Sequence, residues 1–247
     1  MIPGVTAING DAAPWTALFA DRFDERAVAP IATLLSNTQR IISFVSTGDD
    51  AWAANVRRLA PQVHIAFVPP RPPASWTHHV CDWHRQCLRE QGVELTNVPV
   101  APRHNPDGPI VIHPGSGGID KCWPLDRFEM LIEHLSQRGQ KVSPIIGEAE
   151  IERWPRDTLE RWRQRWNVET VLTLDRLHVV LSTARLYIGN DSGPTHLAAQ
   201  LGVATLALFG PTDARVWSPR GPSVKVLSPA IPRPMDWLDV PRVVGAI

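Results

Sequence analysis

The chain has 247 residues, which is enough for one large domain or two small domains with separate apolar cores. Its 25 Lys and Arg residues balance 25 Asp and Glu residues, so the net charge offers no electrostatic basis for binding nucleic acid. No apolar run reaches the length of a membrane-spanning helix, which leaves at most peripheral contact with a membrane.

The cysteines and the N-terminus indicate the compartment. The three cysteines include no Cys-x-x-Cys pair, which suits reduced thiols better than a disulfide framework. The first residues lack the charged and apolar regions of a secretion signal. We therefore expect a cytoplasmic protein, with at most peripheral contact at the inner face of the cytoplasmic membrane.

The first hundred residues predict a small α/β domain. Apolar runs predict strands at 40–45 and 64–68, and helical patterns cover 50–59 and 76–91. The proline-rich segment 98–108 is typical of an interdomain linker. We therefore expect two domains, residues 1–100 and residues 101–247.

The second half of the chain alternates strands with helices. Such alternation favours parallel βαβ units. A helix is predicted from Leu125 to Gln137, followed by Arg138-Gly139 as its C-terminal signal. The predicted strands are 110–113, 142–146, 170–172, 186–188 and 205–209.

A glycine-rich turn follows the first of these strands. Pro109 to Ile112 lead into His113-Pro114-Gly115-Ser116-Gly117-Gly118-Ile119-Asp120-Lys121. Glycines have no Cβ, so their backbone amides can face a ligand closely, and Lys121 adds a mobile cation for a phosphate. Taken alone, the segment also fits a flexible turn with a solvated lysine.

A second strand ends in a comparable turn. The run Leu186–Ile188 is followed by Gly189, and Asn190-Asp191-Ser192-Gly193-Pro194-Thr195-His196 opens a helix rich in Ala and Leu. Helix starts expose unpaired amides and a partial positive charge, so they suit anions. One polar residue is enough for a cap, whereas several polar side chains gather here. Two such junctions in one α/β unit indicate a phosphate-binding site.

Together the junctions resemble the signatures of glycosyltransferase family 9, the ADP-heptose–lipopolysaccharide heptosyltransferases. The resemblance implies a GT-B-like α/β fold of two Rossmann-like domains with parallel sheets, the N-terminal one small and incomplete. It also implies an inverting transfer of a heptose-like sugar from a nucleotide-diphosphate donor such as ADP-heptose to a lipopolysaccharide-type acceptor, a glycolipid or saccharide. No cofactor or metal ion is implied. The residues that carry the resemblance are His113–Gly118, Lys121, Trp123-Pro124, Gly189–His196 and Phe209–Asp213.

The resemblance assigns roles by position. The glycine turn and the helix start are expected to hold the donor phosphates, with Lys121 neutralising the diphosphate and stabilising the charge that grows on it as the sugar leaves. Residues 147–150 resemble a Gly-x-x-Glu in which the glutamate binds the ribose, so Glu150 is the candidate and Glu148 the second choice. Either glutamate also fits ordinary charge at a helix start. The expected donor-binding residues are Ser116, Gly117, Lys121, Glu150, Asp191, Ser192, Gly193, Thr195 and His196.

No catalytic residue is assigned. The family's chains start with a strand, a Gly-Asp turn and a helix, and that aspartate is the presumed base. Here no apolar strand precedes Gly10-Asp11, so Asp11 is expected to be a turn residue before a helix, and an initial βαβ portion is expected to be missing. The alternative is therefore a truncated, non-catalytic nucleotide-sugar-binding protein, and an epimerase of related fold is a third hypothesis.

A cluster of histidines and cysteines lies near the end of the first half. On a helix, Cys81, His84 and Cys87 would share one face, but three ligands from so short a stretch converge poorly on one tetrahedral ion. We therefore expect packing and no metal site. The family often has a histidine near this point, which makes His79 a candidate on the acceptor side.

Overall fold

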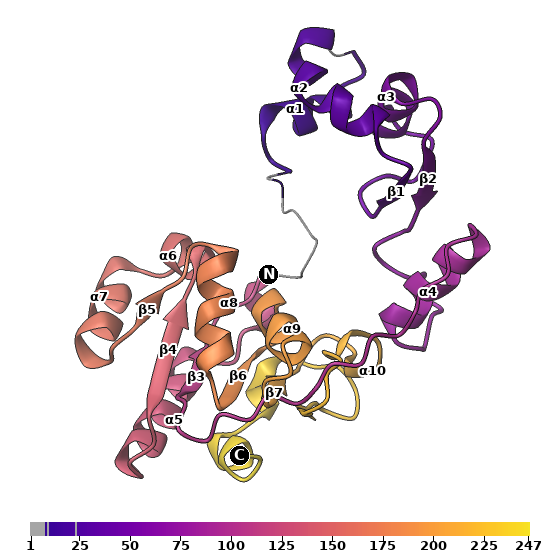
Figure 1. Ribbon diagram of the computed structural model, residues 1–247. Coiled ribbons are helices and arrows are strands. Elements are labelled where there is room, and N and C mark those ends of the chain that lie inside the picture. The colour runs from indigo at the N-terminus through magenta and orange to yellow at the C-terminus, as the bar shows by residue number, and fades with distance from the viewer. Residues whose placement is uncertain (1–7, 9, 23) are drawn as a thin grey trace. The chain divides into compact units, whose positions relative to one another are not determined.

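The structure is a computed structural model that describes residue 8, residues 10–22 and residues 24–247. It divides into two compact units, one made of the residues up to Asn97 and one running from Val98 to Ile247. Figure 1 shows the helices and strands of each unit. No helix in the described ranges is long and apolar enough to cross a membrane.

The N-terminal unit contains a two-stranded parallel sheet, formed within the described residues by β1 (Arg40–Ser43) and β2 (His64–Phe67). Its core joins side chains from α2 and α3, including Val28, Trp52 and Val56. A second, smaller cluster lies where α4 meets β2. The helices are α1 (Ala13–Thr16), α2 (Glu25–Ser36), α3 (Ala51–Leu59) and α4 (Val80–Glu90), with a short 3-10 turn at Ala17–Phe19.

Helix α4 begins later than the sequence predicts. Residues 76–79 are not helical, because His79 has an extended backbone and its Nδ1 accepts a hydrogen bond from the Cys81 amide at 3.1 Å. This side chain satisfies one of the unpaired amides at the helix start, which fixes the start at Val80. The prediction of a helix from residue 76 was therefore wrong by one turn.

The C-terminal unit contains a six-stranded parallel sheet in the order β5-β4-β3-β6-β7-β8. The chain starts at the centre of the sheet, runs to one edge, returns to the centre and runs to the other edge. This is the strand order of a doubly wound Rossmann sheet. The strands are β3 (Ile110–His113), β4 (Val142–Ile146), β5 (Glu169–Thr170), β6 (Leu186–Asn190), β7 (Thr205–Leu208) and β8 (Val224–Leu227).

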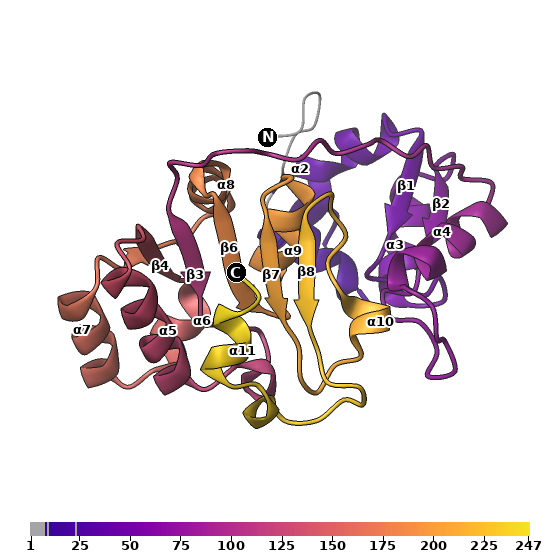
Figure 2. The ribbon, with the colours of Figure 1, turned by 90° about the horizontal axis from the view of Figure 1, so that it is seen from below.

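Both faces of this sheet are buried, as in other parallel sheets. Ile110 and Ile112 pack with α5, α7 and α11 on one face, whereas Val111 packs with α8 and α9 on the other. Figure 2 shows this layering. The helices are α5 (Leu125–Gln137), α6 (Glu148–Arg153), α7 (Arg156–Arg165), α8 (Leu174–Thr183), α9 (Gly193–Gln200), α10 (Ala214–Trp217) and α11 (Val240–Val244).

Most predicted elements of this unit agree with the structure, including β3, β4 and α5. Strand β5 is shorter than predicted and ends at Thr170, and β8 was not predicted at all. Its sequence Val-Lys-Val-Leu is too short to stand out, and only pairing with β7 makes it a strand.

Candidate functional site

The two glycine-containing junctions meet at the centre of the sheet. Strands β3 and β6 are parallel neighbours, with His113 opposite Gly189, so both turns leave the sheet at the same edge. The strand order reverses between these two strands, and doubly wound sheets bind their ligands outside the carboxyl ends of the strands at such a point.

Buried hydrogen bonds hold the two turns together. The Asn190 side-chain amide donates to the carbonyl of Pro114 at 2.7 Å, and its oxygen accepts the Trp123 amide at 2.9 Å. The Ser116 hydroxyl donates to the backbone carbonyl of Asp191 at 2.7 Å. Because these groups are buried, breaking them would leave polar atoms without water, so the turns form one unit.

Asp191 lies at the centre of a charged cluster. Its carboxylate pairs with the Lys121 ammonium at 2.9 Å, accepts the Thr212 hydroxyl at 2.8 Å and lies 3.7 Å from His196 Nε2. Burial raises the pKa of the Asp191 carboxyl, but His196, Lys121 and Thr212 outweigh this effect and hold the pKa below its ordinary value. Asp191 is therefore ionised, and the ion pair holds Lys121 with about a third of its side chain exposed.

Backbone amides around this cluster remain available. Among the described residues, none accepts a hydrogen bond from the amides of Gly117 or Gly118, nor from that of Gly193 at the first position of α9. Gly117 and Gly193 are exposed, and a Cβ at either position would meet nothing within 4 Å. These amides and Lys121 supply the donors that an anion requires.

Glu150 is buried at the start of α6 and held in one orientation. Its Oε2 accepts the Gly147 amide at 2.7 Å and lies 3.3 Å from His113 Nε2. Burial raises the pKa of the Glu150 carboxyl, but the contacts with His113 and the Gly147 amide outweigh burial and hold the pKa below its ordinary value. Glu148, the second choice, is exposed at the first position of the helix.

The other Glu150 oxygen faces the glycine turn. A Cβ at Gly115 would lie 1.6 Å from Oε1, so the carboxylate occupies the space that a side chain at residue 115 would need. A hollow of about 200 Å³ is lined by residues from both turns and from the start of α6, Glu150 among them.

Two of the expected residues turn their side chains inward. Thr195 is fully buried, and its hydroxyl bonds to the backbone carbonyl of Asn190 and to the hydroxyls of Ser192 and Tyr187. Thr195 and Ser192 therefore shape the turn, whereas Lys121 and His196 are partly exposed.

Four residues at this site had no role assigned from sequence. Asn190 and His113 stand inside the quoted motifs, and Thr212 lies in the turn after β7, so their positions were visible although their contacts were not. Arg153, whose guanidinium donates hydrogen bonds to the glycine turn, lies three residues beyond the predicted Gly-x-x-Glu segment and had no signal in the sequence.

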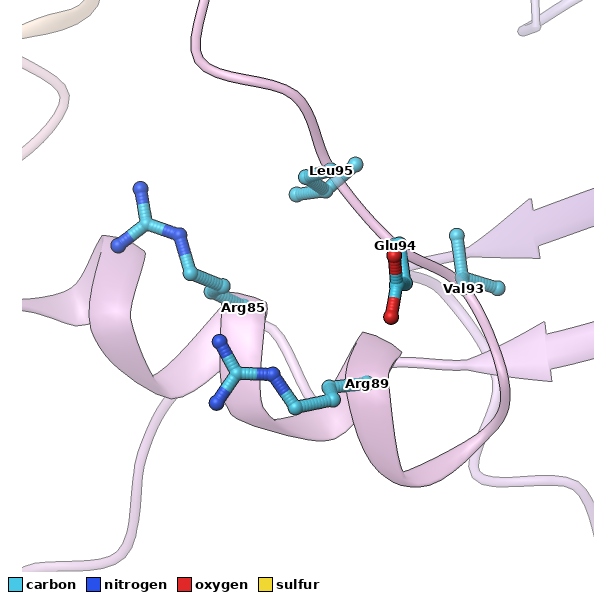
Figure 3. A pocket seen from close by; sticks show the side chains of 5 residues that line it. All are labelled: Arg85, Arg89, Val93, Glu94 and Leu95. Atoms are coloured by element: carbon cyan, nitrogen blue, oxygen red, sulfur yellow. The ribbon is translucent and has the colours of Figure 1, made fainter.

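A separate hollow lies on the N-terminal unit beside α4. Arg85 and Arg89 extend from successive turns of the helix, and Val93, Glu94 and Leu95 follow it (Figure 3). Arg85 pairs with Asp82 at 3.0 Å.

The histidine and cysteine cluster on α4 is dispersed. Cys81 is exposed and Cys87 buried, and His84 Nε2 lies 3.2 Å from the carbonyl of Pro70. No group of three or more candidate ligands in the described ranges could hold a metal ion. His79 is used as the cap of α4.

The strand order and the junction define the class of the C-terminal unit: a doubly wound α/β domain with available backbone amides and a lysine–aspartate pair at its switch point. The model of one family, glycosyltransferase family 9 (heptosyltransferase), matches residues 70–235. The chain belongs to this family.

Named relatives agree with this assignment. Lipopolysaccharide heptosyltransferase 3 of Escherichia coli (strain K12) is 29% identical over 147 residues, which cover 58% of this chain and 41% of the relative. Lipopolysaccharide heptosyltransferase 1 of Pseudomonas aeruginosa is 37% identical over 104 residues, covering 42% of this chain and 29% of the relative. The chain thus spans less than half the length of these relatives.

Solved structures confirm the predicted GT-B-like α/β fold. The E. coli heptosyltransferase WaaC, solved with ADP, has a TM-score of 0.63 at 18% identity, covering 91% of this chain and 78% of that one.

Proposed function

We propose that this chain acts as an inverting glycosyltransferase. It transfers a heptose-like sugar from a nucleotide-diphosphate donor such as ADP-heptose to a lipopolysaccharide-type acceptor, a glycolipid or saccharide. The observation that carries the proposal is the position of Lys121, paired with Asp191 at the switch point of the sheet, beside the unpaired amides of the two turns.

The groups at the switch point suit the diphosphate and the ribose of a nucleotide-sugar donor. A diphosphate in the crevice would take hydrogen bonds from the free amides and charge from Lys121, with His196 as a second cation when protonated. Glu150, ionised and oriented, would accept hydroxyls of the ribose. The names of the relatives support heptose as the sugar and lipopolysaccharide as the acceptor class, and the ADP present in the WaaC structure supports ADP as the nucleotide.

These groups suit the departure of a nucleoside diphosphate. Negative charge develops on the leaving phosphate as the sugar bond breaks, and fixed amides stabilise that charge without having to reorganise. Transfer with inversion further requires a base that deprotonates the acceptor hydroxyl. We assign no residue to this step; Asp11 lies in an exposed turn before α1.

We propose that α4 contributes to the acceptor side. Arg85 and Arg89 provide adjacent cations on α4, which suit an acidic saccharide. We also propose a cytoplasmic location with at most peripheral membrane contact, supported by three free cysteines; cell fractionation tests this proposal.

Calorimetry with ADP, followed by a transfer assay with ADP-heptose, tests the function. Lys121→Ala should weaken ADP binding by about 10- to 100-fold, the value of a charge-assisted contact. Lys141→Ala is the matched control, because Lys141 precedes β4 at the opposite end of the sheet.

The outcomes separate the candidates. ADP binding with transfer that disappears in Lys121→Ala supports the proposal. Binding without turnover favours a non-catalytic nucleotide-sugar-binding protein, an epimerised sugar detected by NMR favours an epimerase, and absence of ADP binding refutes all three.

A further inference from the structure

We infer that Arg153 is a positioning residue that shapes the glycine turn into a binding surface for the donor diphosphate. The inference rests on the proposed function for the identity of the ligand, and on the hydrogen bonds of Arg153 for the role of the residue.

The Arg153 guanidinium donates hydrogen bonds to two consecutive backbone carbonyls. Arg153 is the last residue of α6, and its Nη1 donates to the carbonyl of Ser116 at 2.9 Å while Nη2 donates to the carbonyl of Gly117 at 2.8 Å. The planar fork of arginine matches two neighbouring acceptors, which the single ammonium of a lysine does not. The guanidinium thereby fixes two peptide planes in a segment that contains adjacent glycines.

The orientation of the amides follows from peptide geometry. In a planar trans peptide the carbonyl and the following N–H point in opposite directions. Because the carbonyls of Ser116 and Gly117 point toward Arg153, the amides of Gly117 and Gly118 point away from it. No described residue accepts a hydrogen bond from these two amides, so both remain available to a ligand on the side away from Arg153.

Glycines would not hold this orientation alone. They lose more conformational freedom on ordering than other residues, and that cost would be taken from the binding free energy of the diphosphate. Because Arg153 already holds the two carbonyls in the unliganded protein, the entropy of ordering the turn is lost on folding and not on binding. Helix α6 also carries Glu150, so one short helix orients both the ribose candidate and the phosphate turn.

The role of Arg153 differs from that of Lys121. Lys121 acts by charge on the ligand, whereas Arg153 uses two of its donors on the backbone. A charge effect would survive replacement by lysine and weaken with salt, whereas the positioning effect requires the fork and is insensitive to salt.

The test compares Arg153→Lys and Arg153→Gln with the wild-type chain. Both variants should bind ADP about 5- to 10-fold more weakly, roughly the loss of one hydrogen bond. Affinity for adenosine, which has no phosphate, should be unchanged. Arg156→Ala is the matched control, since Arg156 is 92% exposed and pairs only with Glu160 among the described residues.

A second readout does not depend on the ligand. Amide hydrogen exchange at residues 116–118 should accelerate in both Arg153 variants and not in Arg156→Ala. If the variants exchange and bind ADP as the wild type does, or if only Arg153→Gln is affected, the positioning role is refuted. If the wild type does not bind ADP but exchange still accelerates, the proposed function fails while the positioning of the turn stands.

Discussion

Replacing Gly115 by alanine tests the geometry of Glu150 directly. Gly115 does not have a positive φ, so alanine is compatible with its backbone and only space opposes it. The new Cβ would lie 1.6 Å from Glu150 Oε1 and 2.2 Å from its Cδ, far inside ordinary contact, which starts at 3.4 Å. The carboxylate must therefore leave its position.

The cost can be worked from the contacts that are lost. A displaced carboxylate gives up the Gly147 amide and His113, and hydrogen bonds to charged groups contribute about 1.5–3 kcal/mol each at most. Partial relaxation of the side chain reduces the sum, so we expect about 2 kcal/mol. In a unit of this size that lowers Tm by roughly 4–8 °C. ADP affinity should fall about 10-fold or more, because the ribose acceptor is displaced.

Thermal unfolding and calorimetry with ADP measure both effects. Gly117→Ala is the matched control for thermal unfolding alone, because a Cβ there meets nothing within 4 Å. The control for ADP affinity is Arg156→Ala, because Arg156 is 92% exposed and pairs with Glu160. In a Glu150→Ala background, Gly115→Ala should cost little more, since the clash has been removed. The reasoning is refuted if Gly115→Ala alone keeps the Tm and the ADP affinity of the wild type.

Three further predictions follow from the same structure. The folded-state pKa of Glu150 lies below its ordinary value of 4.5, so the ionised carboxylate stabilises the fold above that pH, and this stabilisation is lost as the pH falls through the folded pKa. Glu150→Gln should therefore flatten the acid side of a plot of Tm against pH. Parallel curves for the variant and the wild type would contradict this. Asn190→Ala removes the buried bonds between the two turns and should lower the free energy of unfolding by about 2–4 kcal/mol, measured by urea denaturation, with no change as the contrary result. Reversing both charges at Arg85 and Arg89 to glutamate should reduce transfer to an acidic acceptor at least about 10-fold while ADP affinity stays constant; unchanged transfer would remove α4 from the acceptor site.

Local patterns were sufficient for most of the C-terminal unit. Short apolar runs bounded by glycine and proline identified β3 and β4, and the amphipathic pattern identified α5 with the observed bounds. The two turns stood out because clustered glycines and polar residues are unusual where a buried strand ends. The prediction failed at the start of α4, where the capping side chain of His79 sets the first helical residue. It also missed β8, which is a strand because it pairs with β7.

The assignment of roles required the fold. Sequence presented Ser192, Thr195 and His196 alike as polar residues around the helix start, yet the structure buries Thr195 and Ser192 and leaves His196 partly exposed. Likewise Glu148 and Glu150 differ only in the face of α6 that they occupy, and the structure buries Glu150.

The sequence by itself determined the alternation of strands and helices, the two glycine-containing turns and the resemblance to a family, because these depend on residues close together in the chain. Tertiary structure alone decided that β3 and β6 are neighbours and that Lys121 reaches Asp191, seventy positions along the chain. It also decided that the Arg153 side chain forms hydrogen bonds with the glycine turn. Such contacts join distant segments, and they arise only when burial of the apolar strands brings the polar turns to the same edge of the sheet.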